Sequence, residues 1–303
     1  MLEPKDFIRD ERAMGRAWAL EESLGYTHWL ATHHYENFHV VSFLLPKRLH
    51  QDFYNVYAFC RWADDMGDEL GDPAESLRML QWWRWETAAM YQGKATHPVF
   101  VALGPTARKY SLPAEPFHDL ITAFEQDQVV TRYPDMAAVM EYCKYSANPV
   151  GRLVLGLCGY HDAELDRLSD ATCTALQLAN FWQDVTVDLK KDRIYIPLDA
   201  LSRYNYTEQE LFALRFDERF QNAMRDIVAV ARAKFHEGLP LARMVDRRLS
   251  IDLTLFSRGG LCILDKIEKQ GYNVLAVRPK ISKTQRVGLL LKALLEVALQ
   301  RAA

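Results

Sequence analysis

The chain has 303 residues, of which 49% are hydrophobic and 25% are charged, as in a globular protein with a substantial core. Its 37 Lys and Arg residues against 40 Asp and Glu residues give a formal net charge of −3, which argues against nucleic acid as a partner. No apolar run approaches the roughly 18 residues of a membrane span, and the charged start "MLEPKDFIRDERAM" does not resemble a signal peptide. We therefore expect a cytoplasmic protein that is at most attached to a membrane surface.

Helical periodicity recurs along the chain, broken by proline and glycine, whereas strand signals are scarce. Asp72-Pro73, Pro134-Asp135 and Ser169-Asp170 supply capping signals for three helices. No linker, composition shift or internal repeat divides the sequence, so we predict one all-α domain over residues 1–303. In chain order the predicted helices cover residues 10–30, 47–70, 74–92, 97–109, 114–130, 135–159, 169–190, 207–237, 249–270 and 283–301. The tryptophans at positions 82, 83 and 85 are expected to pack in the core.

The predicted helix 47–70 ends in "FCRWADDMGDEL", which gathers acids next to residues typical of a buried helix. Asp64 and Asp68 are four residues apart and lie one above the other on a helix face, with Asp65 beside the first. Alone, this spacing is more typical of a solvated helix end than of a metal site.

The predicted helix 169–190 repeats the spacing in "QLANFWQDVTVD", where Asp184 and Asp188 follow Gln177 and Asn180 on one face. The remaining positions of this helix favour burial, and burying such a polar stripe without a partner costs several kcal/mol. Two such stripes on helices facing across one cavity would offset this cost by binding cations.

Carboxylates without thiols or imidazoles select hard cations, and Mg²⁺ commonly shares its positions between a few carboxylates, water and phosphate oxygens. The twin motif therefore predicts a diphosphate held through Mg²⁺. Arg61 and the bases after Asp188, which are Lys190, Lys191 and Arg193, would neutralise the diphosphate, although a solvated helix end is the alternative for the lysines. The predicted metal ligands are Asp64, Asp65, Asp68, Asp184 and Asp188.

From about His33 to Ser282 the sequence resembles the squalene/phytoene synthase family of head-to-head prenyl transferases. The landmarks appear in order as "HYENFHVVSFLLP", "YAFCRWADDMGDE", "FEQDQVVTRY", "YCKYSANPVGRLVL", "QLANFWQDVTVDLKKDRIYIP" and "ILDKIEKQGYNVLAVRPKISK". The resemblance implies an isoprenoid-synthase-type helical bundle with a central active-site cavity, the two aspartate motifs lying on opposite walls. By position match, the pocket-lining or diphosphate-binding residues would be His34, Phe38, Arg61, Tyr142, Gln177, Asn180, Arg193 and Tyr195.

Three departures from the common family pattern are informative. Gln183 replaces the arginine of N-I-L-R-D, "SANPVG" replaces V-A-G-x-V-G, and the first landmark reads H-Y-E-N-F. This combination is similar to the hydroxysqualene synthase branch of bacterial hopanoid biosynthesis. It implies conversion of presqualene diphosphate and water to hydroxysqualene and diphosphate, with Asp64, Asp68, Asp184, Asp188 and Tyr142 as catalytic residues.

Under that resemblance, Mg²⁺ and bases remove diphosphate, and water captures the rearranged cyclopropylcarbinyl cation in an apolar pocket. No reductant is needed, in agreement with the lack of a G-x-G-x-x-G loop. Tyr142, Asn148 and Gln183 are candidates to position the water, with helix packing or capping as their alternative roles.

Two alternatives stay open at this point. One is a presqualene diphosphate or squalene synthase that condenses two farnesyl diphosphates, and the other is an inactive helical protein that scaffolds sister hopanoid-pathway enzymes on a membrane. The C-terminal "VGLLLKALLEVALQRAA" is amphipathic, and we expect it to pack onto the domain, with peripheral membrane contact at the inner face as the alternative.

Overall fold

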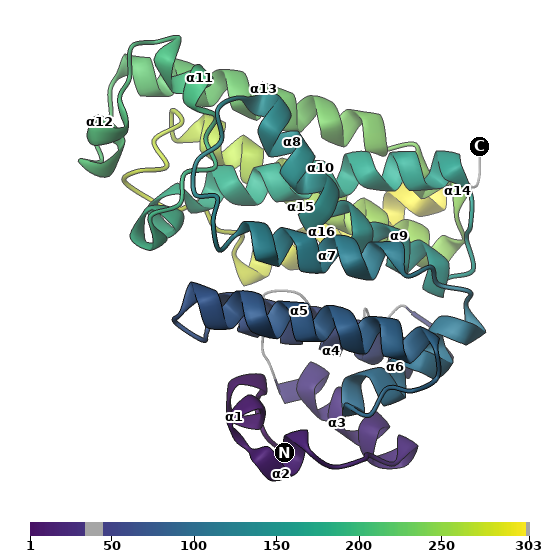
Figure 1. The fold of residues 1–303 in the computed structure, drawn as a ribbon. Coiled ribbons are helices and arrows are strands. Elements are labelled where there is room, and N and C mark those ends of the chain that lie inside the picture. Colours follow the sequence, from purple (N-terminus) through teal and green to yellow (C-terminus); the bar gives the residue numbers. More distant parts are fainter. Residues whose placement is uncertain (34–44, 301–303) are drawn as a thin grey trace. The chain divides into compact units, whose positions relative to one another are not determined.

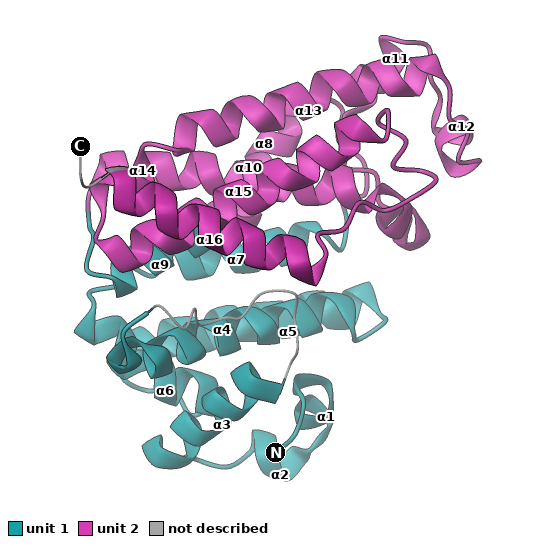
Figure 2. Ribbon diagram, turned by 180° about the vertical axis from the view of Figure 1, so that it is seen from behind, with its two compact units in different colours: residues 1–129, 149–161 teal, residues 130–148, 162–303 magenta. Residues whose placement is uncertain are grey.

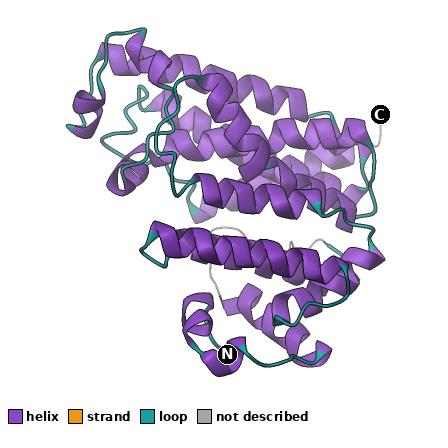
Figure 3. Cartoon of the chain, viewed as in Figure 1, coloured by secondary structure: helices purple, strands orange, loops and turns teal. Residues whose placement is uncertain are grey.

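The computed structural model describes residues 1–33 and 45–300, and every regular element in these ranges is a helix (Figure 3). Within the same ranges, β-type pairing is limited to an isolated bridge between Arg132 and Ile194. The prediction of an all-α fold is therefore confirmed. None of the described helices is both long enough and apolar enough to cross a bilayer.

The chain forms two compact units (Figure 2). Unit 1 comprises residues 1–129 and 149–161, and unit 2 comprises residues 130–148 and 162–303. The chain thus passes between the units after residues 129, 148 and 161, and a single domain over residues 1–303 stays a prediction.

Unit 1 is built mainly from α3 to α7, with short helices at its start (Figure 1). Helix α9 completes it, although the first residue of that helix belongs to unit 2. The helices are α1 (Pro4–Arg9), α2 (Glu11–Met14), α3 (Leu20–His33), α4 (Lys47–Asp68), α5 (Pro73–Tyr91), α6 (Pro98–Lys109), α7 (Glu115–Gln126) and α9 (Asn148–Leu157).

Unit 2 is arranged around its longest helix, α10, against which α13 and α15 pack (Figure 1). Its elements are α8 (Met136–Ser146), α10 (Ala163–Asp188), the 3₁₀ helix η1 (Leu189–Lys191), α11 (Leu198–Ser202), α12 (Glu208–Phe212), α13 (Glu218–Gly238), α14 (Leu241–Met244), α15 (Arg247–Lys269) and α16 (Lys283–Gln300).

Aromatic residues fill the core of unit 1. The Trp62 and Trp83 rings stack at 5.2 Å between centroids, and the buried His97 ring packs edge-on at 4.4 Å from Trp62. The prediction of a core role for the tryptophans holds for Trp83 but is wrong for Trp85, which is 66% exposed. Two residues along a helix point about 200° apart, so both cannot face the same core.

Close approach of helices shapes the core of unit 2. A Cβ added at Gly238 would collide with Thr172 of α10, and one added at Gly260 would collide with the ring of Phe235. Helix α13 therefore lies near both α10 and α15 at distances that only glycine permits at these two positions.

Three predicted helices are broken in the structure, and a fourth begins earlier than expected. The predicted helix 10–30 divides into α2 and α3, with residues 15–19 outside either helix. The predicted helix 135–159 divides at Ala147 into α8 and α9, and the predicted helix 207–237 divides into α12 and α13. Helix α10 begins at Ala163, because Asp162 accepts hydrogen bonds from the Glu164 and Leu165 backbone N–H groups. The predicted caps at Asp72 and Asp135 are confirmed, whereas the cap predicted at Ser169-Asp170 is wrong because these residues lie inside α10.

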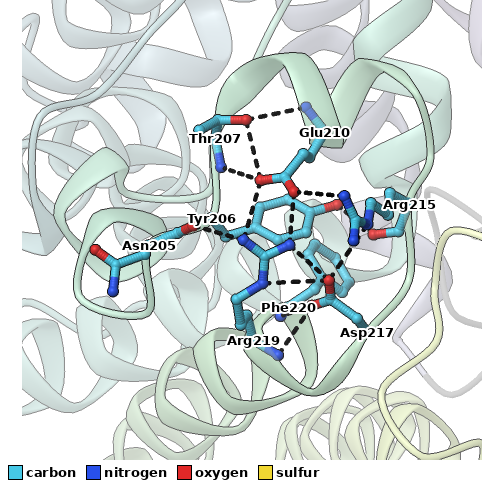
Figure 4. Close-up of polar contacts among 8 residues, drawn as sticks. All are labelled: Asn205, Tyr206, Thr207, Glu210, Arg215, Asp217, Arg219 and Phe220. Atoms are coloured by element: carbon cyan, nitrogen blue, oxygen red, sulfur yellow. Dashed lines mark hydrogen bonds and ion pairs between the residues drawn. The ribbon is translucent and has the colours of Figure 1, made fainter.

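An ion network explains the break between α12 and α13 (Figure 4). The Arg219 guanidinium donates to Glu210, to Asp217 and to the Asn205 carbonyl oxygen. These bonds hold the pKa of Glu210 at about 2, chiefly through Arg219. Asp217 also caps α13 by accepting from the Arg219 and Phe220 backbone N–H groups, so a new helix starts there.

Candidate active site

The first aspartate motif occupies the last turns of α4 in unit 1. Arg61 forms ion pairs with Asp65, one turn ahead, and with Asp64 at 3.5 Å. The Asp65 side chain is buried, at 5% exposure, whereas that of Asp64 is 45% exposed and Asp68 is an exposed residue. Helical spacing therefore separates the motif into a buried pair, Arg61 with Asp65, and two accessible carboxylates one turn apart.

Helix α7 braces this end of α4. The Gln128 side-chain amide donates at 3.0 Å to the Gly67 carbonyl oxygen and also to the Phe124 carbonyl oxygen. A Cβ at Gly67 would lie 3.4 Å from the Phe124 ring, so the two helices are in close contact between Asp65 and Asp68. Sequence reasoning did not assign a role to Gln128, although it lies in the landmark "FEQDQVVTRY".

The second aspartate motif occupies the last turns of α10 in unit 2. Asp184 is largely buried and forms a two-pronged ion pair with Arg278, in which Nη2 lies 2.9 Å from Oδ2 and Nε contacts Oδ1. The hydrogen bond to Asp184 raises the pKa of Arg278, and the negative charges of Asp184 and Asp188 add to this rise. A bidentate pair of this kind combines strength with fixed geometry.

The residue before Asp184 contacts the same segment as Asp184, namely the loop between α15 and α16. The Gln183 side-chain amide donates at 2.6 Å to the Pro279 carbonyl oxygen. Neighbouring side chains of α10 thus pin residues 278 and 279, which lie more than 90 positions further along the chain. Sequence reasoning missed Arg278 because no local pattern in "VRPK" reveals a partner so distant.

The polar stripe of α10 is confirmed as a feature of one helix, but it is not buried as expected. Asn180 is exposed, and Gln177 and Asp188 are partly exposed, while the intervening Phe181 and Trp182 are buried. The stripe therefore borders solvent or a ligand, and its desolvation cost is smaller than a buried stripe would carry.

Aromatic rings form a wall beside Asp188. Phe181 and Tyr195 stack at 3.8 Å between centroids, and Tyr133 and Tyr142 pack against Tyr195 at 5.6 and 5.8 Å. A small pocket of about 10 Å³, about the room of one water molecule, adjoins this wall. It is smaller than the roughly 300–1,000 Å³ of ordinary ligand sites, so by itself it would not hold a C30 chain. Its lining residues are Phe181, Val185, Asp188, Leu189, Arg193, Ile194, Tyr195, Ile196 and Leu211.

The loop after α10 is fixed in place. The Ile194 backbone N–H donates to the Thr131 carbonyl oxygen at 2.9 Å, and Arg132 forms ion pairs with Asp192 and Glu208. Asp192 adopts a left-handed conformation, with φ of 56°, which turns the chain so that Tyr195 returns to the aromatic wall. Of the predicted pocket residues in unit 2, Arg193 and Tyr195 thus line one pocket with Asp188, and Tyr142 packs against Tyr195.

The remaining predicted residues differ in what the structure says about them. Asn148 is buried and accepts a hydrogen bond from the Thr174 hydroxyl at 2.9 Å, and Gln183 bonds to Pro279, so both make the packing contacts named as their alternative roles. Lys190 and Lys191 are exposed at a helix end. His34 and Phe38 lie outside the described residues.

The carboxylates of the two motifs differ in how well they fit Mg²⁺. Among the described residues, no three His, Cys, Asp or Glu side chains are grouped so that they could hold a metal ion by themselves. Asp64 and Asp68 nevertheless offer accessible oxygen donors, which fit an ion that takes one or two carboxylates and completes its shell with water and phosphate. Asp184 would fit such an ion only if its carboxylate released Arg278 or bound the ion and Arg278 together. The meeting of both motifs around one substrate stays a prediction, because they belong to different units.

Known proteins resemble the chain over most of its length. It is 33% identical over 240 residues to the hydroxysqualene synthase of Sinorhizobium fredii, covering 78% of this chain and 80% of that protein. It is 31% identical over 263 residues to the phytoene synthase of Thermus thermophilus, covering 86% and 89%. The crystal structure of squalene synthase HpnC from Alicyclobacillus acidocaldarius matches with a TM-score of 0.80 and 43% identity, covering 84% of this chain and 96% of that one.

These relatives carry three different reaction names, so they agree on a family and a fold rather than on a product. The sequence model described as squalene/phytoene synthase matches residues 31–285, which include both aspartate motifs, Gln128 and Arg278. Since this match covers well over half of its residues, the chain belongs to the squalene/phytoene synthase family.

Proposed function

We propose that the protein converts presqualene diphosphate and water to hydroxysqualene and diphosphate with the help of Mg²⁺. The observation that carries this proposal is the pairing of aspartates at the ends of α4 and α10 with arginines suited to a diphosphate, namely Arg61, Arg193 and Arg278. In the proposed active state, the two helix ends approach the same diphosphate.

Asp64 and Asp68 would hold the cation on α4, and Asp184 and Asp188 would hold it on α10. When bound, Mg²⁺ would neutralise the diphosphate and so weaken its bond to the cyclopropylcarbinyl carbon. Arg61 forms ion pairs with the buried Asp65 and with Asp64, so of the three predicted ligands of the first motif Asp64 and Asp68 are the more accessible to an ion. Arg278 would turn from Asp184 to the departing diphosphate and neutralise part of its charge.

The aromatic wall of unit 2 suits a carbocation. The faces of Phe181, Tyr195 and Tyr142 carry negative π density, and a cation close to them is stabilised without a nucleophile that would capture it early. The apolar pocket residues exclude bulk water, so that one held water adds to the rearranged cation and loses a proton. Tyr142 is our main candidate to hold it, since Asn148 and Gln183 already make packing contacts.

Gln183 supports the hydroxysqualene reading over condensation of two farnesyl diphosphates. Where relatives of the family commonly carry an arginine on α10, this chain has an amide that holds Pro279. Positive charge at this end of α10 therefore comes from Arg278, in the loop between α15 and α16. Compared with relatives that carry an arginine at the position of Gln183, the site would have one cationic side chain fewer to bind a second diphosphate.

Feeding one substrate at a time tests the proposal. Purified protein with Mg²⁺ is given presqualene diphosphate alone or farnesyl diphosphate alone, and products are identified by mass spectrometry. We expect hydroxysqualene from the first substrate and no C30 product from the second. Presqualene diphosphate or squalene formed from farnesyl diphosphate would establish the alternative reaction, and no diphosphate release from either substrate would favour an inactive scaffold.

The proposal includes a cytoplasmic location with peripheral contact at the inner face of the membrane. A C30 alcohol and its diphosphate precursor are both lipids, so transfer to and from a bilayer would accompany each turnover. Sister enzymes of the hopanoid pathway are the expected neighbours there, because one makes the substrate and another consumes the product.

A further inference from the structure

Helix α16 is apolar on two opposite sides. Its inner side packs on α15 through Ala293 and Val297, which are fully buried, in agreement with the expected packing onto the domain (Figure 1). Its outer side exposes Val287, Leu291, Leu295 and Leu299 by 58%, 61%, 60% and 61%. A helix normally turns one apolar face to the core and a polar face to solvent, so a second apolar face on the outer side implies a cover.

The spacing of these four residues makes them one continuous surface. Each follows the last by four positions, and residues four apart are neighbours along a helix face. Single exposed leucines are ordinary on a protein surface, but an unbroken row along a whole helix is not. We call Val287, Leu291, Leu295 and Leu299 the α16 stripe. The family match ends at residue 285, so the α16 stripe lies beyond the region that defines the family.

Basic residues border the α16 stripe. At about 100° per residue, Lys283 falls on one side of the stripe and Lys292 on the other, and Arg286 adds a third exposed charge. The only acid in the sequence of α16 is Glu296, which forms an ion pair with Arg258 of α15, with Nε 2.6 Å from Oε2. The exposed charge of the helix is therefore entirely positive.

The basic border continues at the C-terminal end of the helix. Figures 1 and 2 both place that end of α16 beside α14. There Met244 is 48% exposed, next to the exposed Arg243, Arg247 and Arg248, with Asp246 capping α15 among them. Three bases against one acid keep this area positive.

We propose that α16 lies in the surface of an anionic lipid bilayer, with the α16 stripe among the acyl chains and the bordering lysines at the phosphates. An in-plane helix combines an apolar face with Lys and Arg along its edges, and long basic side chains reach from the edge to the headgroups. A second copy of the chain fits less well, since two α16 helices face to face would bring lysines together without an exposed acid on either helix. The inference extends the membrane contact in the proposed function.

Vesicle flotation tests this without any substrate. The full chain is mixed with vesicles of phosphatidylcholine alone or with 30% phosphatidylglycerol, and the bound fraction is measured after centrifugation. We expect binding to the anionic vesicles at least tenfold stronger than to the neutral ones, with loss at high salt. Because the assay contains no diphosphate, its result and that of the substrate-feeding experiment are independent.

Paired variants identify the surface. Leu291→Gln with Leu295→Gln should lower binding at least tenfold, while Trp85→Gln with Leu20→Gln, which removes comparable exposed apolar groups from unit 1, should leave it within twofold. Circular dichroism and thermal melting check that both double variants fold.

Each outcome of these experiments either supports or overturns the proposal. Failure of the wild-type chain to float, or equal binding by both double variants, would overturn the proposal. So would a dimer of the wild-type chain that dissociates in the Leu291→Gln, Leu295→Gln variant, because a second copy would then cover the stripe. Loss of binding in that variant alone, together with a monomer in solution, would support the proposal.

Discussion

The ends of α4 and α10 carry the same acidic spacing but obtain their positive charge in different ways. On α4 the partner is Arg61, which lies on the same helix within one turn of Asp64 and Asp65. On α10 the partner is Arg278, which the chain brings back from a loop beyond α15. Helix geometry fixes the first arrangement, whereas the second depends on tertiary structure and can be exchanged without unwinding a helix.

This difference assigns the two motifs different tasks. Arg61 forms ion pairs with the buried Asp65 and with the more exposed Asp64 of its own helix, so under the proposed function the α4 motif would offer its exposed carboxylates to a cation without a rearrangement of distant segments. Asp184 is paired with Arg278, so under the proposed function the α10 motif would accept a cation only as Arg278 moves away. Metal binding at α10 should therefore be coupled to the position of residues 278 and 279.

Removing one aspartate from each motif should have the largest effect. Asp64→Ala and Asp184→Ala should each lower turnover of presqualene diphosphate at least a hundredfold, because each removes charge stabilisation of the leaving diphosphate. Helix content by circular dichroism should not change. Only Asp184→Ala should also expose the 278–279 segment to a protease, and full activity in either variant would remove that motif from the metal site.

Replacing the arginine of each motif by methionine should lower the unfolding free energy by different amounts. Arg61→Met leaves the buried Asp65 carboxylate without its ion pair and should cost about 3 kcal/mol of unfolding free energy in urea. Arg278→Met breaks a more exposed pair and should cost about 1 kcal/mol.

The variant with the smaller loss of stability, Arg278→Met, should show the larger change in metal affinity. With its competing cation gone, Asp184 should bind Mn²⁺, used as a probe for Mg²⁺, several-fold more tightly in Arg278→Met by titration calorimetry. Arg61→Met should show no such gain. Equal costs and equal affinities would mean that the two motifs do not differ in the way described.

The two units should also differ in their response to acid. His97 in unit 1 lies in an aromatic box, neither ring nitrogen has a hydrogen-bond partner among the described residues, and burial lowers its pKa well below 6.5. The unfolded chain binds a proton there first, so stability falls by about 1.4 kcal/mol per pH unit as pH drops below 6.5. In unit 2, Glu210 has its pKa lowered to about 2, so its contribution is complete above pH 4.5 and is lost only between 4.5 and 2.

Hydrogen exchange as a function of pH measures this order. Unit 1 should lose protection at a higher pH than unit 2, and His97→Phe should shift the loss in unit 1 to lower pH. His236→Phe, at an exposed histidine, is the matched control. Simultaneous loss of both units in every variant would contradict the expected order.

Local features of the fold were predictable from the sequence, and long-range contacts were not. Periodicity located α4 and α10, and cap residues located the starts of α5 and α8, because these signals lie within a few positions of the structure they determine. The break before Asp217 depends on the Arg219 network, and the role of Arg278 on a partner 94 positions away, so neither is readable from a window. Gln128 and Gln183 likewise act through backbone carbonyl groups, which no side-chain pattern reveals.

Residues 149–161 interrupt the sequence of unit 2 but belong to unit 1, where Leu153 and Leu157 are buried in the same cluster as Phe59, Trp62 and Phe117. During synthesis, the first 129 residues would therefore leave the ribosome with an incomplete interior and wait until α9 has emerged. A translational pause or a truncation before that point should yield an aggregation-prone, protease-sensitive intermediate instead of a folded unit 1.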